Sequence, residues 1–234
     1  MKAHQIIVGV VIVIILYLLY HYYFGDSSRS TLSSIRDAST ELTIGASSLP
    51  AGASADFTYS IWVYVSNWNT RLGETKVIYS RGGSGNTPGT PTVSFDKTLN
   101  NVNVSLATYG SGGSAQTSTC TLENVPIQAW TNIIVTLNNR ALDLYLDGKL
   151  VRTCILPGVP KGAPGTVMNL TPGGGFSGYT AGFLYYARAV NPREAYAIYR
   201  EGYGGEDWLS SLFNKYRIKI AFMEDNREVN SFEI

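Results

Sequence analysis

Histidine is almost missing from this chain of 234 residues. It occurs twice, as His4 and His21, and the sequence after Tyr22 contains none. That long remainder therefore cannot form a Ser-His-Asp or Cys-His nucleophilic centre, and it has no imidazole to offer a metal ion. The composition excludes these familiar classes of catalytic and metal site from most of the chain.

An excess of basic residues is missing as well. The chain has 18 Lys and Arg against 17 Asp and Glu, and after Lys2 the two signs are equal in number. Proteins that bind nucleic acid need a basic excess to neutralise phosphates. We therefore expect no nucleic-acid partner.

Cysteine is scarce, since Cys120 and Cys154 are the only two. Each lies in a predicted strand that flanks the hairpin between Trp130 and Asp147. A disulfide can form if those strands are neighbours. Two buried free cysteines are the alternative, which is common in proteins that fold in a reducing compartment. The sequence leaves both open.

One long apolar run is present at the N-terminus. Residues 6–20 read IIVGVVIVIILYLLY, and with their flanks they give 22 residues. As a helix these would span about 33 Å, which suits a bilayer core of roughly 30 Å. A cleaved signal peptide would have a shorter run and a small-residue cleavage site, whereas bulky YHYYFGD follows here. We predict a single-pass transmembrane helix within residues 1–24, with the lipid bilayer as partner and the C-terminal part across the membrane.

A stalk and one all-β domain are predicted after this anchor. Residues 25–55 are rich in Ser, Gly and Ala and read as a stalk, with one short strand at residues 42–44. Residues 56–234 read as the domain, because apolar residues alternate with polar ones from Phe57 onward, and turn signals such as Asp147-Gly148 separate many short runs. This pattern predicts a β-sandwich or jelly roll. The expected strands are residues 57–65, 76–80, 92–95, 102–109, 118–122, 131–137, 142–146, 150–155, 167–170 and 178–187.

One or two short helices and a hairpin are predicted near the C-terminus. Asn191 can cap a helix that has Pro192 at its first position and Glu194 completing a capping box. A second amphipathic segment covers residues 207–215. The chain should close with a β-hairpin that turns at residues 224–226.

The central hairpin resembles a known family. Residues 129–135 (AWTNIIV), followed by residues 142–151 (LDLYLDGKLV), resemble the laminin-G-like, concanavalin-A-like jelly roll. Residues 120–126, 150–162, 173–179 (GGGFSGY) and 231–234 (SFEI) are similar to a subgroup encoded by large DNA viruses, notably those that infect algae. The resemblance covers about residues 55–234. It implies an N-terminal membrane span and a place in the virion as a minor capsid or membrane-associated protein.

The acidic residues do not suggest catalysis. Glucanases of this fold carry an E-x-D-x-x-E strand that holds two carboxylates together, and this sequence has no such motif. Asp143 and Asp147 share a strand face, but Asp147 is explained by its turn. The pairs Glu206-Asp207 and Glu224-Asp225 fall in expected caps or turns. We predict no enzymatic activity, no catalytic residue, no cofactor and no metal site.

Sugar binding is a separate alternative. Lectins of this fold often hold Ca²⁺ through clustered Asp and Asn, and the acidic residues here are scattered. The Gly173–Gly175 run lacks the lysine and helix of a phosphate-binding loop, so a tight turn is the default. Tyrosines are plentiful and could form a sugar platform, although packing is the commoner use; they include Tyr179, Tyr185, Tyr186, Tyr196, Tyr199 and Tyr203.

The main hypothesis is a non-enzymatic, membrane-anchored structural protein of a viral particle. In that role a minor capsid protein at the interface of the virion inner membrane and the capsid would link the membrane to capsid or other virion proteins. The neutral, Tyr-rich domain suits protein contacts better than charge-driven capture. A membrane-anchored lectin with a glycan partner is the alternative, and a glycoside hydrolase ranks below both.

Overall fold

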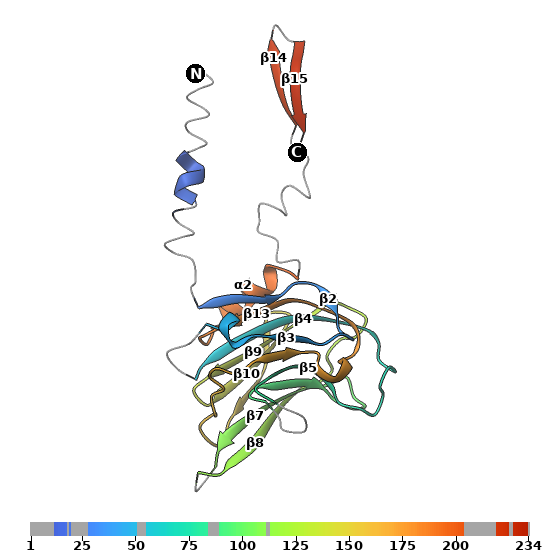
Figure 1. Cartoon of the computed structure of the whole chain (residues 1–234), viewed down its shortest axis with the longest axis vertical. Coiled ribbons are helices and arrows are strands. Elements are labelled where there is room, and N and C mark those ends of the chain that lie inside the picture. Colours follow the sequence, from blue (N-terminus) through green and yellow to red (C-terminus); the bar gives the residue numbers. More distant parts are fainter. Residues whose placement is uncertain are drawn as a thin grey trace.

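The computed structural model describes residues 12–17, 19, 28–50, 55–83, 89–110, 113–203, 219–224 and 227–233. Two antiparallel sheets stack face to face in it (Figure 1). The first sheet has the order β1 (Arg29–Ser33), β13 (Ser177–Tyr186), β4 (Phe57–Asn67), β9 (Thr131–Asn138), β10 (Ala141–Leu146) and β11 (Lys149–Ile155), and β2 (Arg36–Asp37) also pairs with β13. The second sheet has the order β3 (Leu42–Ile44), β12 (Met168–Leu170), β5 (Lys76–Arg81), β6 (Thr92–Phe95), β7 (Val102–Tyr109) and β8 (Ala115–Leu122).

Strand β4 shows why the sheets stack. Its alternate residues from Phe57 to Val65 all enter one buried cluster, which confirms the predicted face. Because successive side chains in a strand point to opposite faces, Trp62 and Tyr64 lie on the outer side of the sheet. The core thus fills the space between the two sheets, as in other β-sandwiches. The all-β sandwich prediction is confirmed.

The predicted helix is α2 (Pro192–Arg200), and it covers the outer face of the first sheet. The Asn191 side chain accepts a hydrogen bond from the Glu194 backbone, and the Glu194 carboxylate accepts one from the Asn191 N–H. Ala195 and Ile198 pack in a second buried cluster with residues of β9, β10 and β13. The capping box therefore places an apolar helix face on the sheet.

The sandwich also contains two short 3-10 helices, η1 (Ala46–Ser48) and η2 (Pro172–Gly174). The β10–β11 hairpin turns at Asp147 and Gly148, which both have positive φ, as the Asp-Gly signal predicts.

A disulfide joins the two sheets at one edge of the sandwich. It links Cys120 of β8 to Cys154 of β11, with 6.1 Å between the two Cα atoms. Strands β8 and β11 are the last strands of their sheets on that side. The bond therefore closes an edge where no backbone ladder crosses from one sheet to the other.

The expected stalk differs from the structure. Residues 29–33 and 36–37 pair with β13, and residues 42–44, the short strand expected within the stalk, pair with β12. The Ser-rich composition was misleading because these are edge strands, whose side chains are partly exposed and need little apolar alternation. The sandwich thus begins near Arg29, and a fragment starting at Ala55 would lack three strands.

The chain ends are described only in part. Residues 12–17 and 19 are helical, and their large apolar side chains are exposed. Within the described residues no helix reaches the length and apolar content that crossing a membrane requires. The rest of the predicted anchor, and the predicted helix at residues 207–215, lie outside the described residues. The terminal hairpin is present as β14 (Lys219–Glu224) and β15 (Arg227–Glu233), a separate two-stranded sheet.

Candidate functional site

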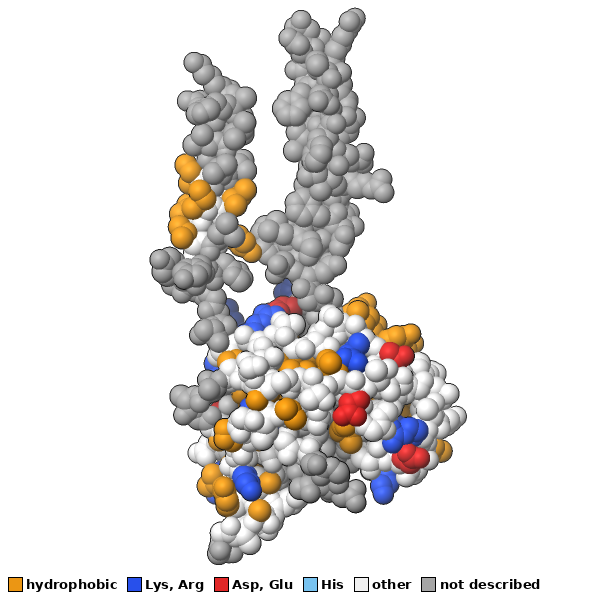
Figure 2. All heavy atoms as spheres, in the orientation of Figure 1, with side chains coloured by type: hydrophobic (Ala, Val, Ile, Leu, Met, Phe, Trp, Pro, Cys, Tyr) orange, Lys and Arg blue, Asp and Glu red, His pale blue; other side chains and the backbone are white. Residues whose placement is uncertain are grey.

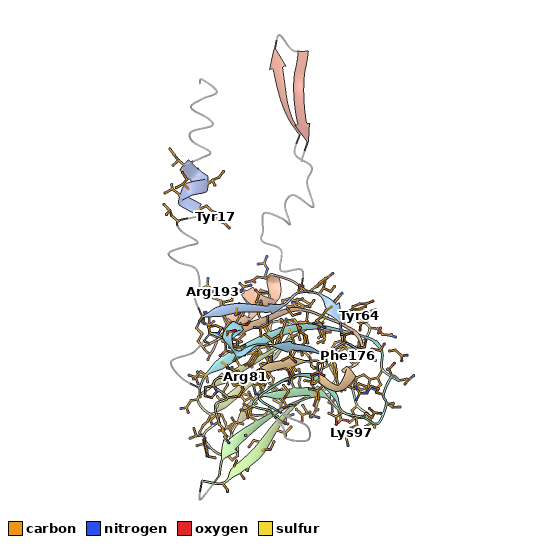
Figure 3. All side chains as sticks on the ribbon, viewed as in Figure 1. Tyr17, Tyr64, Arg81, Lys97, Phe176 and Arg193 are labelled. Atoms are coloured by element: carbon orange, nitrogen blue, oxygen red, sulfur yellow. A yellow bond between two sulfur atoms is a disulfide. The ribbon has the colours of Figure 1, made fainter. Side chains whose placement is uncertain are left out.

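A cavity of about 310 Å³ opens at the end of the sandwich where β4 finishes. We call it the hydroxyl pocket, because four serine and threonine side chains line it. Figure 3 shows Tyr64 and Phe176 toward this end of the domain and Arg81 toward the other. Its lining residues are Asp37, Ser39, Ser66, Thr70, Gly174, Phe176, Ser177, Gly178 and Tyr179.

Close backbone packing shapes the hydroxyl pocket. Gly178 approaches the Tyr64 carbonyl so closely that a Cβ there would lie 1.9 Å from the oxygen. Gly175 has a φ of +38°, and a Cβ there would meet the Ala38 carbonyl at 2.2 Å. Arg71 holds the glycine run in place, since its Nη1 donates to the carbonyls of Gly173 and Gly175 at 2.8 and 3.0 Å. The Gly173–Gly175 run is therefore a tight turn, as expected from the sequence, and together with the start of β13 it forms one wall of the cavity.

Polar groups in the hydroxyl pocket are arranged for hydrogen bonding. Asp37 Oδ1 accepts from the Ser39 backbone N–H and hydroxyl, both at 2.7 Å. These two bonds, led by the hydroxyl, hold the pKa of Asp37 below its usual value, so the side chain stays a carboxylate. The hydroxyls of Ser66 and Ser177 lie 3.0 Å apart and bond to each other. The pocket thus offers a charged acceptor beside hydroxyls that can donate or accept.

An aromatic ring borders these polar side chains. Tyr179 is 47% exposed, lines the pocket, and has its ring centroid 6.5 Å from that of Tyr64. Tyr64 in turn contacts Trp130 at 5.7 Å, and Trp130 stacks on Tyr203 at 4.6 Å. Ring contacts continue across the outer face of the first sheet as far as α2. We call this chain of rings the aromatic row: Tyr179, Tyr64, Trp130, Tyr203, Trp62, Tyr199 and Tyr196.

The charged side chains on the visible surface of the domain are mixed in sign (Figure 2). Lys and Arg side chains alternate with Asp and Glu on the face shown in Figure 2, with no large area of one sign. The described residues contain no group of three His, Cys, Asp or Glu placed to hold a metal ion. The hydroxyl pocket combines a carboxylate, hydroxyls and an exposed ring in one cavity, which is a suitable lining for a small polar ligand.

The acidic residues and tyrosines that the sequence offered as site candidates lie in different environments in the structure. Asp143 accepts a bond from the Thr153 hydroxyl at 2.6 Å, and Asp147 accepts one from the Asn132 N–H at 2.8 Å, so the hydrogen bonds of both are local. Tyr185 and Tyr186 are buried, as packing predicts, whereas Tyr179, Tyr196 and Tyr203 are exposed. The pair Glu206-Asp207 lies outside the described residues, as does Asp225.

Sequence reasoning missed the pocket itself. Its polar side chains come from β2 and β4 and from the start of β13, which lies more than 100 residues further along the chain. The signal that was available is the GGGFSGY segment, which contributes five of the lining residues. Nothing in the sequence shows that Asp37 and Ser66 face the same cavity.

Comparison with solved structures finds the same architecture in toxin domains. The botulinum neurotoxin serotype G binding domain superposes with a TM-score of 0.54 and 17% identity, over 79% of this chain and 46% of that one. The serotype D ligand binding domain, solved in complex with N-acetylneuraminic acid, gives 0.56 and 10%, over 74% and 43%. The chain thus spans under half the length of these domains, and at such identity the likeness concerns the fold alone.

Sequence comparison gives the family. No curated protein matches the chain. Residues 36–196 match the Laminin_G_3 family model, described as the concanavalin A-like lectin/glucanases superfamily. That match covers more than half of the chain and includes β2 through the first half of α2. The chain belongs to the Laminin_G_3 family of the concanavalin A-like lectin/glucanase superfamily.

Proposed function

We propose that this protein is a non-enzymatic carbohydrate-binding protein whose sugar site is the hydroxyl pocket with Tyr179. One observation carries the proposal, namely an exposed aromatic ring beside a carboxylate and several hydroxyls in a single cavity. The lectin-type family and a structural neighbour solved with N-acetylneuraminic acid agree with it at the level of fold. The lectin alternative thus ranks ahead of the structural role that the sequence favoured.

The chemistry of the pocket fits a neutral monosaccharide or the end of a glycan chain. A sugar ring has a face of C–H groups, which are weakly positive and are attracted to the negative face of an aromatic ring such as that of Tyr179. The hydroxyls around the sugar ring need acceptors and donors, which Asp37, Ser66 and Ser177 supply. A cavity of about 310 Å³ has room for one such ring.

A glycan array probed with the full chain in detergent tests this function. We expect a defined set of glycans to bind, and binding to fall about tenfold for Tyr179→Ala. Tyr109→Ala is the matched control, because Tyr109 is equally exposed, at 47%, but lies on β7 away from the hydroxyl pocket. Binding should survive a chelator, since the contacts come from side chains. A folded protein that binds no glycan would contradict the proposal.

A structural role is the second candidate, and the aromatic row favours it. Beyond the hydroxyl pocket the row continues to Tyr203 and Tyr196, which are exposed and are not part of the pocket lining. Exposed aromatic residues are enriched where proteins bind each other. In this role the protein would be anchored by a single N-terminal span through residues 1–24. It would act as a minor capsid protein that links a virion inner membrane to the capsid.

Particle fractionation tests the second candidate. The protein should stay with purified virus particles after external soluble proteins are washed away, and detergent should release it. Its absence from particles would contradict the virion role and leave the glycan proposal untouched.

A further inference from the structure

A second cavity, of about 440 Å³, lies at the opposite end of the sandwich. Its lining includes Phe57 at the start of β4, whereas the hydroxyl pocket includes Ser66 near the end of that strand. Nine strand residues separate the two positions, which is roughly 30 Å. We call this cavity the arginine cavity, because Arg81 at the end of β5 lines it. The two cavities are separate sites, so a ligand of the arginine cavity is independent of the proposed function.

Arg81 in this cavity is a half-buried cation without a carboxylate partner among the described residues. Its Nη1 donates to the hydroxyl oxygens of Tyr59 and Tyr185, at 3.0 and 3.4 Å, and the guanidinium lies 5.3 Å from the Tyr185 ring centroid. Burial raises the pKa of Tyr59 well above its usual value, so that partner is a neutral phenol. Neutral acceptors orient the guanidinium but leave its charge uncompensated, and an uncompensated charge out of water is costly.

The other end of the guanidinium remains available. Arg81 Nη2 makes no hydrogen bond to a described residue and is not fully buried, whereas Nε is buried and has no hydrogen-bond partner. Lys161 lines the same cavity and is exposed, and its backbone N–H is fixed to the Ala107 carbonyl at 2.8 Å. The one acidic lining residue, Asp56, uses Oδ1 to accept the Asn139 N–H at 2.7 Å. Two cations against one anion give the cavity a net positive charge.

Most of the remaining lining residues are apolar. They include Leu49, Phe57 and Leu137, and the Lys161–Gly165 loop forms the rim. A ligand for this cavity therefore needs an anionic group at one end and an apolar body at the other. A planar carboxylate matches the forked guanidinium, which can donate two parallel bonds.

We propose that the arginine cavity binds a small organic acid, with its carboxylate against Arg81 and Lys161 and its apolar body against Leu49, Phe57 and Leu137. The ligand supplies the negative charge that Tyr59 and Tyr185 do not. No covalent step is involved.

Titration calorimetry of the full chain with 3-phenylpropionate tests the site. For a probe of this size we expect a dissociation constant on the order of 1 mM. The amide 3-phenylpropanamide has the same apolar body without the charge and should bind at least tenfold more weakly. Acetate and inorganic phosphate, which lack the apolar body, should bind at least tenfold more weakly too.

Variants separate the site from a structural role of Arg81. Arg81→Met should abolish binding, but it also removes two hydrogen bonds to tyrosines and could unfold the protein. Lys161→Glu changes an exposed side chain only, and it should weaken binding about fivefold while the midpoint of thermal unfolding stays unchanged. Lys97→Glu is the matched control, an exposed lysine outside the cavity, and should bind as the parent does (Figure 3).

The proposal is overturned if 3-phenylpropionate shows no saturable binding, or if Lys161→Glu binds it as tightly as the parent. Equal affinity for the amide, or for phosphate, would overturn the assignment to an organic acid. Loss of binding through Tyr179→Ala would place the ligand in the hydroxyl pocket instead and would also overturn it.

Discussion

Removing the disulfide between Cys120 and Cys154 should cost the domain a large share of its stability. The bond closes a loop of 34 residues between strands at the edges of the two sheets. In the chain-entropy model, a loop of this length restricts the unfolded chain by about 3.8 kcal/mol at 25 °C. Small domains are stable by only about 5–15 kcal/mol, so the loss should be easy to measure.

Denaturant unfolding of the full chain and of the double variant Cys120→Ala/Cys154→Ala gives the difference directly. With an m value of about 2 kcal/mol/M in urea, a loss of 3–4 kcal/mol lowers the midpoint by about 1.5–2 M. A reducing agent should bring the parent close to the variant and leave the variant unchanged. Lys97→Ala, which alters an exposed loop side chain, should unfold like the parent.

A difference below about 1 kcal/mol would refute this reasoning. It would mean that the two thiols are free in solution, or that the bond restricts the unfolded chain much less than its loop length predicts. Labelling of unfolded, unreduced protein with a thiol reagent separates these two outcomes, because only free cysteines react.

Four further predictions concern single residues. Lys76→Met should leave stability unchanged or raise it by about 1 kcal/mol, because the ammonium is buried and makes no hydrogen bond, although it lies 4.6 Å from the Trp68 ring centroid. Burial also lowers the pKa of Lys76, so the stability of the parent should rise with pH as the side chain loses its proton. That rise should be missing in the variant. Asn191→Ala should cost about 1 kcal/mol in denaturant unfolding by removing the cap of α2. Gly178→Ala should destabilise by about 1–3 kcal/mol and disturb glycan binding, because the new methyl group would collide with the backbone beside the hydroxyl pocket. Glycan affinity should stay constant as the pH is lowered to the range where carboxylates usually titrate, and it should decrease only at still lower pH, because the pKa of Asp37 is lowered. A loss of affinity already at about pH 6 would argue against Asp37 as an acceptor.

Much of the fold follows from local patterns. The alternation along β4 identified its buried face, the Asp147-Gly148 turn marked a hairpin, and Asn191 with Glu194 marked the start of α2. Each of these depends on neighbours within a few residues. Local sequence chemistry is therefore sufficient to predict them.

The edge strands and the candidate site depend on distant neighbours. Strands β1 and β2 carry mostly Ser, Thr and Arg, and only their pairing with β13 makes them strands. Asp37, Ser66 and Ser177 meet because β2 and β4 both pair with β13, which no local pattern contains. Sequence periodicity reports which face is buried, but it does not report which polar residues from separate strands gather in a cavity.

The affinity of the full chain for its best glycan, compared with that of Tyr179→Ala, tests the central claim most directly. We expect the loss of the exposed ring to cost about 1.5 kcal/mol, or roughly tenfold in dissociation constant, while both proteins unfold at the same denaturant concentration. Tyr196→Ala, at the far end of the aromatic row, should bind as the parent does. Equal affinity of Tyr179→Ala and the parent would contradict the placing of the sugar in the hydroxyl pocket.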